Sequence, residues 1–297
     1  MSTRRLLLLL AFAGVALILS ACRSGGGDGV ESPTPAEGAT ATPVEVEDEG
    51  RTVTSDDGKL TLEIPPGALD QEIAISITAV PLEELPEELQ VLRGAGAGYR
   101  LEPDGLEFSK PVAVTLELGR DELEDEPEDG ITAYGLVSLT ADGERELLDE
   151  LRTEASLGEA TVLVRGELSH FSWLGRTKGS LTVLLEEVQR EQPVGGQFQA
   201  QATWSNTDTS GVVTLGSGVA EYLASGSVQV AGDVFAVQDD ITPGQEVEGG
   251  TLYECSESQQ GPGAYGVLVT LRSTVQAGDE TIVTRLRVVL VSAVDCG

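Results

Sequence analysis

Few residues in this chain have side chains suited to catalysis or metal binding. It has one histidine, His170, and three cysteines, Cys22, Cys255 and Cys296, in 297 residues. Nucleophile–base pairs and zinc sites draw mostly on histidine and cysteine, so this shortage argues against them. We therefore expect neither an enzyme nor a bound cofactor.

Carboxylates, in contrast, are abundant. The chain holds 50 Asp and Glu against 18 Lys and Arg, which gives a formal net charge of −32. Such a surface repels phosphate polyanions and anionic lipid headgroups, so we expect no nucleic-acid partner.

The densest acidic run lies between Asp121 and Gly130, with seven acids in ten residues. Calcium takes oxygen ligands, so Asp121, Asp125 and Asp129 are candidate calcium ligands. The run lacks the spacing of an EF-hand, and clustered carboxylates usually form a solvated loop. We favour the loop and expect no metal.

The N-terminus has the pattern of an export signal. Arg4 and Arg5 precede an apolar run from Leu6 to Leu19, which as a helix would rise only about 21 Å, less than a bilayer core. The run ends in Leu-Ser-Ala-Cys at 19–22, which resembles the lipobox of bacterial lipoproteins. This resemblance implies a signal peptide over residues 1–21, cleavage before Cys22, and a lipid on the Cys22 thiol that anchors the chain to a membrane. The alternative is an ordinary cleaved signal with a chance cysteine.

If Cys22 carries lipid, Cys255 and Cys296 remain as an even pair. In an oxidising compartment outside the cytoplasm we expect them to form a disulfide. The alternative is two reduced, buried thiols.

Residues 22–50 are rich in Gly, Pro and small polar residues, and they end in a cluster of acids. This composition predicts a disordered tether between the lipid and the folded part.

Beyond residue 50 the pattern predicts an all-β protein. Apolar residues alternate with polar ones, as in Leu60–Ile64 and Phe198–Trp204, and Gly, Pro and Asp mark the turns. Only Leu82–Leu92 has a helical pattern, which Pro86 limits to a turn or two. Two long strands, Ala264–Val275 and Thr281–Val294, flank a predicted hairpin loop. Both tryptophans, Trp173 and Trp204, lie in alternating strands and are predicted to be in the core.

We predict two antiparallel β-sandwich domains. The first covers residues 51–175, a short polar linker covers 176–179, and an immunoglobulin-like sandwich with one disulfide covers 180–297.

Three stretches of the first half together resemble a known family. They are DGKLTLEIPPGAL at 57–69, YRLEPDGLEFSKPV at 99–112 and LSHFS at 168–172. In this order they resemble the ZU-five domain of zonula occludens proteins, ankyrins, netrin receptors and bacterial surface proteins. The resemblance covers about residues 50–175 and implies an antiparallel β-sandwich that scaffolds or binds proteins. The residues themselves predict turns at Gly67 and at Pro103-Asp104-Gly105.

The resemblance also implies a reaction, because some family members cleave themselves within His-Phe-Ser. On this chain the Ser172 hydroxyl would attack the Phe171 carbonyl with His170 as base, and water would hydrolyse the resulting ester. The alternative, which we favour, is a plain strand.

We therefore expect a non-enzymatic binding or scaffold protein, lipid-anchored at the cell surface or the periplasmic face of a bacterial membrane. Its partner would be a protein or an envelope component. We expect recognition through three loops of the second domain: Asp208–Gly211, Asp239–Gly244 and Gln259–Gly263. A self-cleaving, two-piece surface protein and an accessory subunit of an envelope complex are the alternatives.

Overall fold

The computed structural model describes residues 42–44, 50–123, 126–140, 142–232, 235–237, 240–277 and 280–297. The predicted signal peptide, Cys22 and most of the predicted tether lie outside these residues. Within the tether, however, Thr42–Val44 forms a short strand that pairs antiparallel with Ile73–Ile75.

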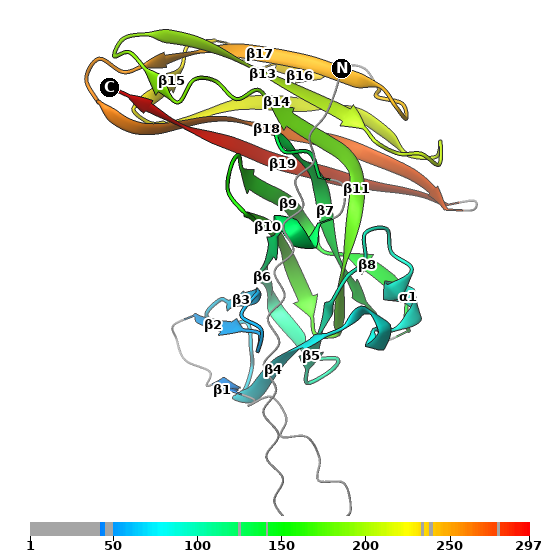
Figure 1. Cartoon of the computed structure of the whole chain (residues 1–297). Coiled ribbons are helices and arrows are strands. Elements are labelled where there is room, and N and C mark those ends of the chain that lie inside the picture. Colours follow the sequence, from blue (N-terminus) through cyan, green and yellow to red (C-terminus); the bar gives the residue numbers. More distant parts are fainter. Residues whose placement is uncertain are drawn as a thin grey trace, which may run out of the picture. The chain divides into compact units, whose positions relative to one another are not determined.

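The chain is all-β, as predicted, with its strands in two large sheets (Figure 1). The first sheet has the order β1-β4-β5-β11-β13-β17-β15, with β7 beside β11 and β8 beside β7. Its strands are β1 (Thr42–Val44), β4 (Ile73–Val80), β5 (Gly98–Glu102), β7 (Gly130–Leu139), β8 (Arg145–Leu147), β11 (Trp173–Leu185), β13 (Gln197–Asn206), β15 (Val228–Val230) and β17 (Glu246–Cys255).

The second sheet has the order β16-β14-β18-β19-β9-β10-β6-β3-β2, with β12 beside β19. Its strands are β2 (Arg51–Thr54), β3 (Leu60–Ile64), β6 (Glu107–Gly119), β9 (Asp149–Ser156), β10 (Thr161–His170), β12 (Glu191–Gln192), β14 (Thr214–Gly226), β16 (Phe235–Val237), β18 (Gly261–Ala277) and β19 (Glu280–Cys296). The described helices are α1 (Glu87–Gln90) and two 3-10 turns, η1 (Leu82–Glu84) and η2 (Arg120–Glu122). Pro86 separates η1 from α1, as its missing N–H predicts.

The predicted alternation places the core between the two sheets. Leu60 and Leu62 are fully buried, while Glu63 between the inward positions is exposed. Phe198, Ala200, Ala202 and Trp204 are likewise buried on one face of β13. Tyr253 on β17 donates a hydrogen bond of 2.7 Å to the Gly266 carbonyl on β18, which links the layers. Trp173, in contrast, was predicted to be in the core but is only half-buried. The Arg100 guanidinium lies 5.5 Å from its ring centroid.

The predicted turns are confirmed at the backbone. Gly67 and Gly105 have φ of +70° and +73°, a conformation that side chains with a Cβ rarely adopt. The turn at 103–105 carries the chain from β5 in one sheet to β6 in the other, so it connects the two layers of the sandwich.

The predicted linker at 176–179 is wrong, because these residues lie inside β11. One edge of β11 pairs with β7 from Leu174 to Lys178, while its other edge pairs with β5 at Trp173–Leu174 and with β13 from Leu181. The first sheet therefore continues across the predicted boundary.

The polar residues of this stretch have partners distant in sequence. The Lys178 ammonium lies 2.7 Å from the Glu126 carboxylate, and the side chains are only 14% and 4% exposed. Glu126 also accepts hydrogen bonds from the Tyr134 hydroxyl and the Thr132 amide. Burial and the adjacent Glu126 carboxylate raise the pKa of Tyr134. A buried charge is tolerated when it is paired and hydrogen-bonded in this way.

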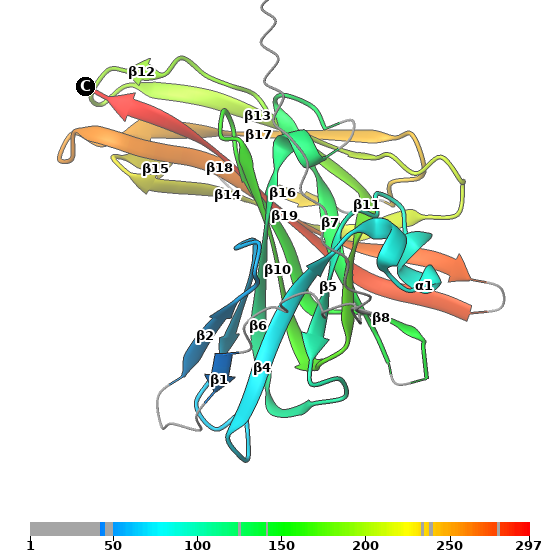
Figure 2. The same ribbon diagram turned by 60° about the horizontal axis from the view of Figure 1, so that its bottom comes forward.

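The second sheet is joined by a parallel ladder. Val288–Val291 of β19 pair with Thr153–Ser156 of β9, so the last strand of the chain adds to strands formed more than a hundred residues earlier. Figure 1 labels both strands, and Figure 2 shows β19 from another side. We infer that residues 51–175 and 180–297 unfold together.

The two tryptophans test this inference, since Trp173 and Trp204 lie on opposite sides of the predicted boundary. In a Trp204→Phe background, Leu290→Ala on β19 should lower the stability measured through Trp173 fluorescence by about 2–5 kcal/mol, the cost of a cavity at a fully buried leucine. The measurement is urea unfolding, and far-UV circular dichroism should give the same midpoint. A Trp173 transition that Leu290→Ala does not shift would show two independent units.

Candidate functional site

Some of the predicted site residues lie outside the described residues. These are Cys22, with the whole lipobox, and Asp125 of the candidate calcium ligands. Lipidation and calcium binding by these residues stay predictions.

The predicted disulfide is confirmed. Cys255 ends β17 and Cys296 ends β19, both are fully buried, and their Cα atoms lie 5.6 Å apart in the bonded pair. The bridge joins the two sheets at one end of the sandwich, since β17 and β19 belong to different sheets. It closes a loop with a sequence separation of 41, which restricts the unfolded chain.

The His170-Phe171-Ser172 segment begins at the last residue of β10 and connects that strand to β11, with a bend at Ser172. The nitrogens of the His170 ring lie 3.2 Å from the Leu139 carbonyl oxygen and 3.4 Å from the Ser169 hydroxyl. The Phe171 ring is fully buried against Phe108, and its carbonyl accepts a hydrogen bond from the Gly105 amide. Among the described residues other than glycine only Glu150 has a positive φ, so this segment shows no left-handed strain. Self-cleavage stays a prediction.

The acidic run at 121–130 contributes to the local structure. Glu122 accepts hydrogen bonds from Lys59 and from the Gly119 amide, and Glu126 pairs with Lys178. Asp121 and Asp129 are exposed. Within the described part of the chain, three or more metal-ligating side chains do not gather at any point.

The three predicted recognition loops do not form one surface. Asn206 is buried, and its amide donates hydrogen bonds to the carbonyls of Val213 and Ile241, which joins the 208–213 loop to the 240–244 loop. Leu215, just beyond them, lies opposite Ser273 near one end of β18. The third loop leads into Gly261 at the other end of that strand, about 40 Å away at 3.3 Å per residue.

Asp208 organises the first of these loops. Burial alone would raise the pKa of its carboxyl, but hydrogen bonds from the Ser210 hydroxyl and from the amides of Val213, Ser210 and Val212 outweigh burial and hold that pKa below its ordinary value. The loop conformation therefore depends on an ionised carboxylate.

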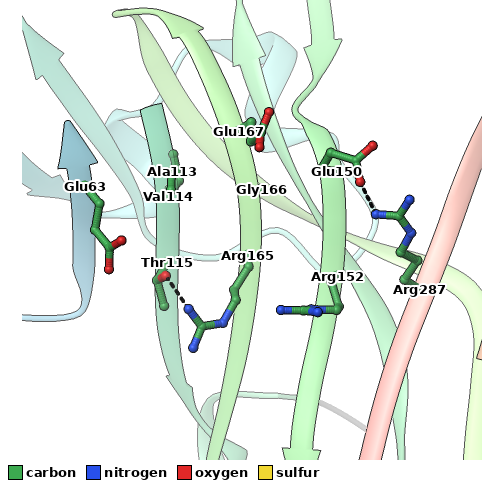
Figure 3. A pocket seen from close by; sticks show the side chains of 10 residues that line it. All are labelled: Glu63, Ala113, Val114, Thr115, Glu150, Arg152, Arg165, Gly166, Glu167 and Arg287. Carbon is green, nitrogen blue, oxygen red and sulfur yellow. Dashed lines mark hydrogen bonds and ion pairs between the residues drawn. The ribbon is translucent and has the colours of Figure 1, made fainter. Parts of the chain in front are cut away.

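A charged groove that sequence reasoning missed lies on the outward face of the second sheet (Figure 3). We call it the arginine groove. Its volume is about 280 Å³, and its floor is formed by β3, β6, β10, β9 and β19. Ten residues line it: Glu63, Ala113, Val114, Thr115, Glu150, Arg152, Arg165, Gly166, Glu167 and Arg287.

Arg152 and Arg165 face each other across β9 and β10 and share one carboxylate. Arg152 lies 2.6 Å and Arg165 3.0 Å from different oxygens of Glu154, and Arg165 also donates to the Thr115 hydroxyl at 3.3 Å. Each guanidinium has five N–H donors, so both retain donors beyond those used by Glu154 and Thr115.

Glu150 and Arg287 form the other side of the groove. Glu150 has φ of +51°, a region that residues with a Cβ occupy at a cost of about 1–3 kcal/mol, and its carboxylate pairs with the Arg287 guanidinium. This ion pair lowers the pKa of Glu150. Backbone strain of this kind is concentrated at functional sites, so it marks the groove as the candidate site.

The groove is of mixed charge, since three guanidinium groups on adjacent strands share it with the carboxylates of Glu63, Glu150 and Glu167. In strands where apolar and polar residues alternate, the polar positions include Arg152, Arg165 and Arg287. This pattern predicts only that the three side chains face outward. No local sequence pattern predicts the antiparallel register that places Arg165 opposite Arg152. Nor does one predict the parallel ladder that places Arg287 beside them.

Comparisons with known proteins assign no family. No protein-family model matches the chain, and no curated protein matches it. Among solved structures, the adhesive subunit CfaE of the CFA/I fimbria of enterotoxigenic Escherichia coli is similar over 74% of this chain and 87% of that one, with 8% identity and a TM-score of 0.15. A score this low supports no conclusion about fold or function. Across the described residues, no helix has the length and apolar character needed to cross a bilayer.

The disulfide should contribute strongly to stability. Replacing both cysteines with serine should lower the free energy of unfolding by about 4 kcal/mol in the chain-entropy model. Urea unfolding of the double variant against the parent measures this difference. Cys255→Ser and Cys296→Ser alone should give similar losses, because either change removes the bridge. A loss below about 1 kcal/mol would contradict a structural role.

Asp208→Asn should destabilise the protein at neutral pH, by an amount of the order of 1 kcal/mol. The folded pKa of Asp208 lies below its unfolded value, so its contribution is complete above the unfolded pKa and is lost as the pH falls through the folded one. The difference between parent and variant should therefore shrink below about pH 4 in urea unfolding at a series of pH values. Asp129→Asn, at an exposed position, serves as the control.

Proposed function

We propose that this chain is a lipid-anchored extracytoplasmic protein of a bacterial membrane that acts as a non-enzymatic binding or scaffold protein. One observation carries the proposal: the Cys255–Cys296 disulfide uses two of the three cysteines. It leaves Cys22, the cysteine of the lipobox-like sequence, as the remaining thiol.

The disulfide and the lipobox-like sequence support the same location by independent arguments. Structural disulfides persist in oxidising compartments outside the cytoplasm, and the apolar run at 6–19 is the kind of segment that directs export. A diacylglyceryl group with a further acyl chain contributes about 0.8 kcal/mol per buried CH₂ group, which makes such an anchor stable.

The folded part supports a binding role. Its strands form a rigid two-sheet body, and the arginine groove gives that body a charged surface on one sheet face. Rigid scaffolds that display charged side chains suit recognition of a protein or an envelope component.

Replacing Cys22 with alanine tests the anchor. The parent should incorporate labelled palmitate and sediment with membranes, whereas Cys22→Ala should lose the label and move to the soluble fraction, because the acceptor thiol is gone. A Cys255→Ala/Cys296→Ala chain is the matched control, since it also loses cysteines but should keep the label. Unchanged labelling in Cys22→Ala would refute the proposal.

A further inference from the structure

A second cavity lies where the chain passes from β5 to β6, from β7 to β8 and from β10 to β11. We call it the end cavity. Its volume is about 470 Å³, larger than that of the arginine groove. Part of its lining is apolar, because the buried side chains of Leu139 and Phe171 and the half-buried Trp173 contribute to it.

The charged side chains in this lining are acidic. Asp104, Glu107 and Glu146 are exposed at the cavity, and none of the three forms an ion pair or a hydrogen bond with a described residue. The described lining contains neither lysine nor arginine. The end cavity therefore differs from the arginine groove, where the carboxylates have guanidinium partners.

The two arginines nearest to the lining in sequence do not offset these carboxylates. Arg100 lies over the Trp173 ring, but its guanidinium is paired with Glu102 at 3.0 Å. Arg145 precedes Glu146 on β8, and successive side chains of a strand point to opposite sides, so it lies on the other side of that strand.

The remaining charges near the cavity add to its acidity. Lys110, three residues beyond Glu107, donates a hydrogen bond to the Pro66 carbonyl. The turn between β7 and β8 carries two more exposed acids, Asp142 and Glu144. These three basic residues, Arg100, Arg145 and Lys110, stand against six acids: the three in the lining together with Glu102, Asp142 and Glu144.

A buried hydroxyl without a partner also lines the cavity. Ser172 is only 6% exposed, and no described residue forms a hydrogen bond with its side chain. Buried hydroxyl groups are usually hydrogen-bonded, so this one is left for a ligand. The His170 ring beside it is already engaged, because one nitrogen can donate to the Leu139 carbonyl while the other accepts from the Ser169 hydroxyl.

The placing of the carboxylates selects among cations. Across the described residues, three or more metal-ligating side chains do not gather at any point, so Asp104, Glu107 and Glu146 lie around the cavity and cannot share one metal ion. A cation that contacts them all must carry separated charges. The apolar lining suits a hydrocarbon chain between those charges.

We propose that the end cavity binds a linear aliphatic polyamine. Its ammonium groups pair with Asp104, Glu107 and Glu146, and one of them donates a hydrogen bond to the Ser172 hydroxyl. Its methylene groups lie against the Trp173 ring and the apolar lining. A quaternary ammonium ion fits less well, because it has no N–H to donate to the hydroxyl.

This site is separate from the arginine groove and from the lipid anchor, so the inference goes beyond the function proposed above. Its failure would leave the palmitate-labelling result unchanged, and the two proposals can be judged apart.

The test uses the full-length chain in a non-ionic detergent and isothermal titration calorimetry with spermidine. About 150 mM NaCl screens exposed charges that lie more than about 8 Å apart, which limits non-specific binding to an acidic protein. Spermidine should bind saturably at one site. Hexylamine, which carries one ammonium group on a similar chain, should bind at least about tenfold more weakly.

Two variants locate the site. Glu107→Gln/Glu146→Gln should weaken spermidine binding about tenfold. The matched control, Glu246→Gln/Glu248→Gln, removes the same charge at exposed positions on β17 outside the cavity and should change binding less than about twofold.

Ser172→Ala should weaken binding about threefold and leave the free energy of unfolding unchanged in urea, because its hydroxyl has no described partner to lose. If Glu107→Gln/Glu146→Gln fails to fold by circular dichroism, Ser172→Ala and the hexylamine comparison decide the question.

Three results would overturn the inference. They are the absence of saturable spermidine binding, equal effects of the two double variants, and tighter binding of calcium chloride or of an oligolysine peptide than of spermidine.

Discussion

Backbone pairing along β11 and β19 is the constraint on which the rest of the structure depends. A strand edge that lacks partners exposes N–H and C=O groups, so each sheet needs continuous neighbours. One edge of β11 pairs first with β5 and then with β13, and the strand pairing on this edge is interrupted between Leu174 and Leu181. The 93–96 loop fills this gap, because the Lys178 amide donates to the Arg93 carbonyl at 2.6 Å. Gly94 allows this approach, since a Cβ there would lie 2.8 Å from that of Lys178.

The features that sequence could predict are local. Alternation at Leu60–Ile64 and Phe198–Trp204 correctly separated buried from exposed positions, and Gly67, Gly105 and Pro86 marked the chain's turns. The disulfide followed from counting cysteines. The linker prediction at 176–179 was wrong because glycine and polar residues usually mark a linker. In this fold Lys178 instead forms an ion pair with Glu126, about fifty residues earlier in the sequence.

The candidate site could not be predicted, because it is a property of register between distant strands. Arg152, Arg165 and Arg287 lie on three strands, and a shift of one residue in any pairing would turn that strand's arginine toward the core. Burying an unpaired guanidinium is costly, so the charges themselves help to select the register that keeps them outside. The same charges lie close to Glu150 and Glu154, which limits repulsion among the arginines in the unbound protein.

The last strand, β19, links the stability of the fold to the geometry of the arginine groove. β19 ends at Cys296, which is covalently held to β17, and its middle pairs in parallel with β9. A parallel ladder of four residues is a weak restraint by itself, and β-strands with few pairs can slip. The disulfide fixes the end of β19 eight residues beyond Val288, and the long antiparallel pairing with β18 fixes its remainder. With both in place, Arg287 is held beside Arg152, where its guanidinium pairs with the Glu150 carboxylate. The disulfide therefore restrains the strand that carries Arg287, even though neither cysteine lines the groove.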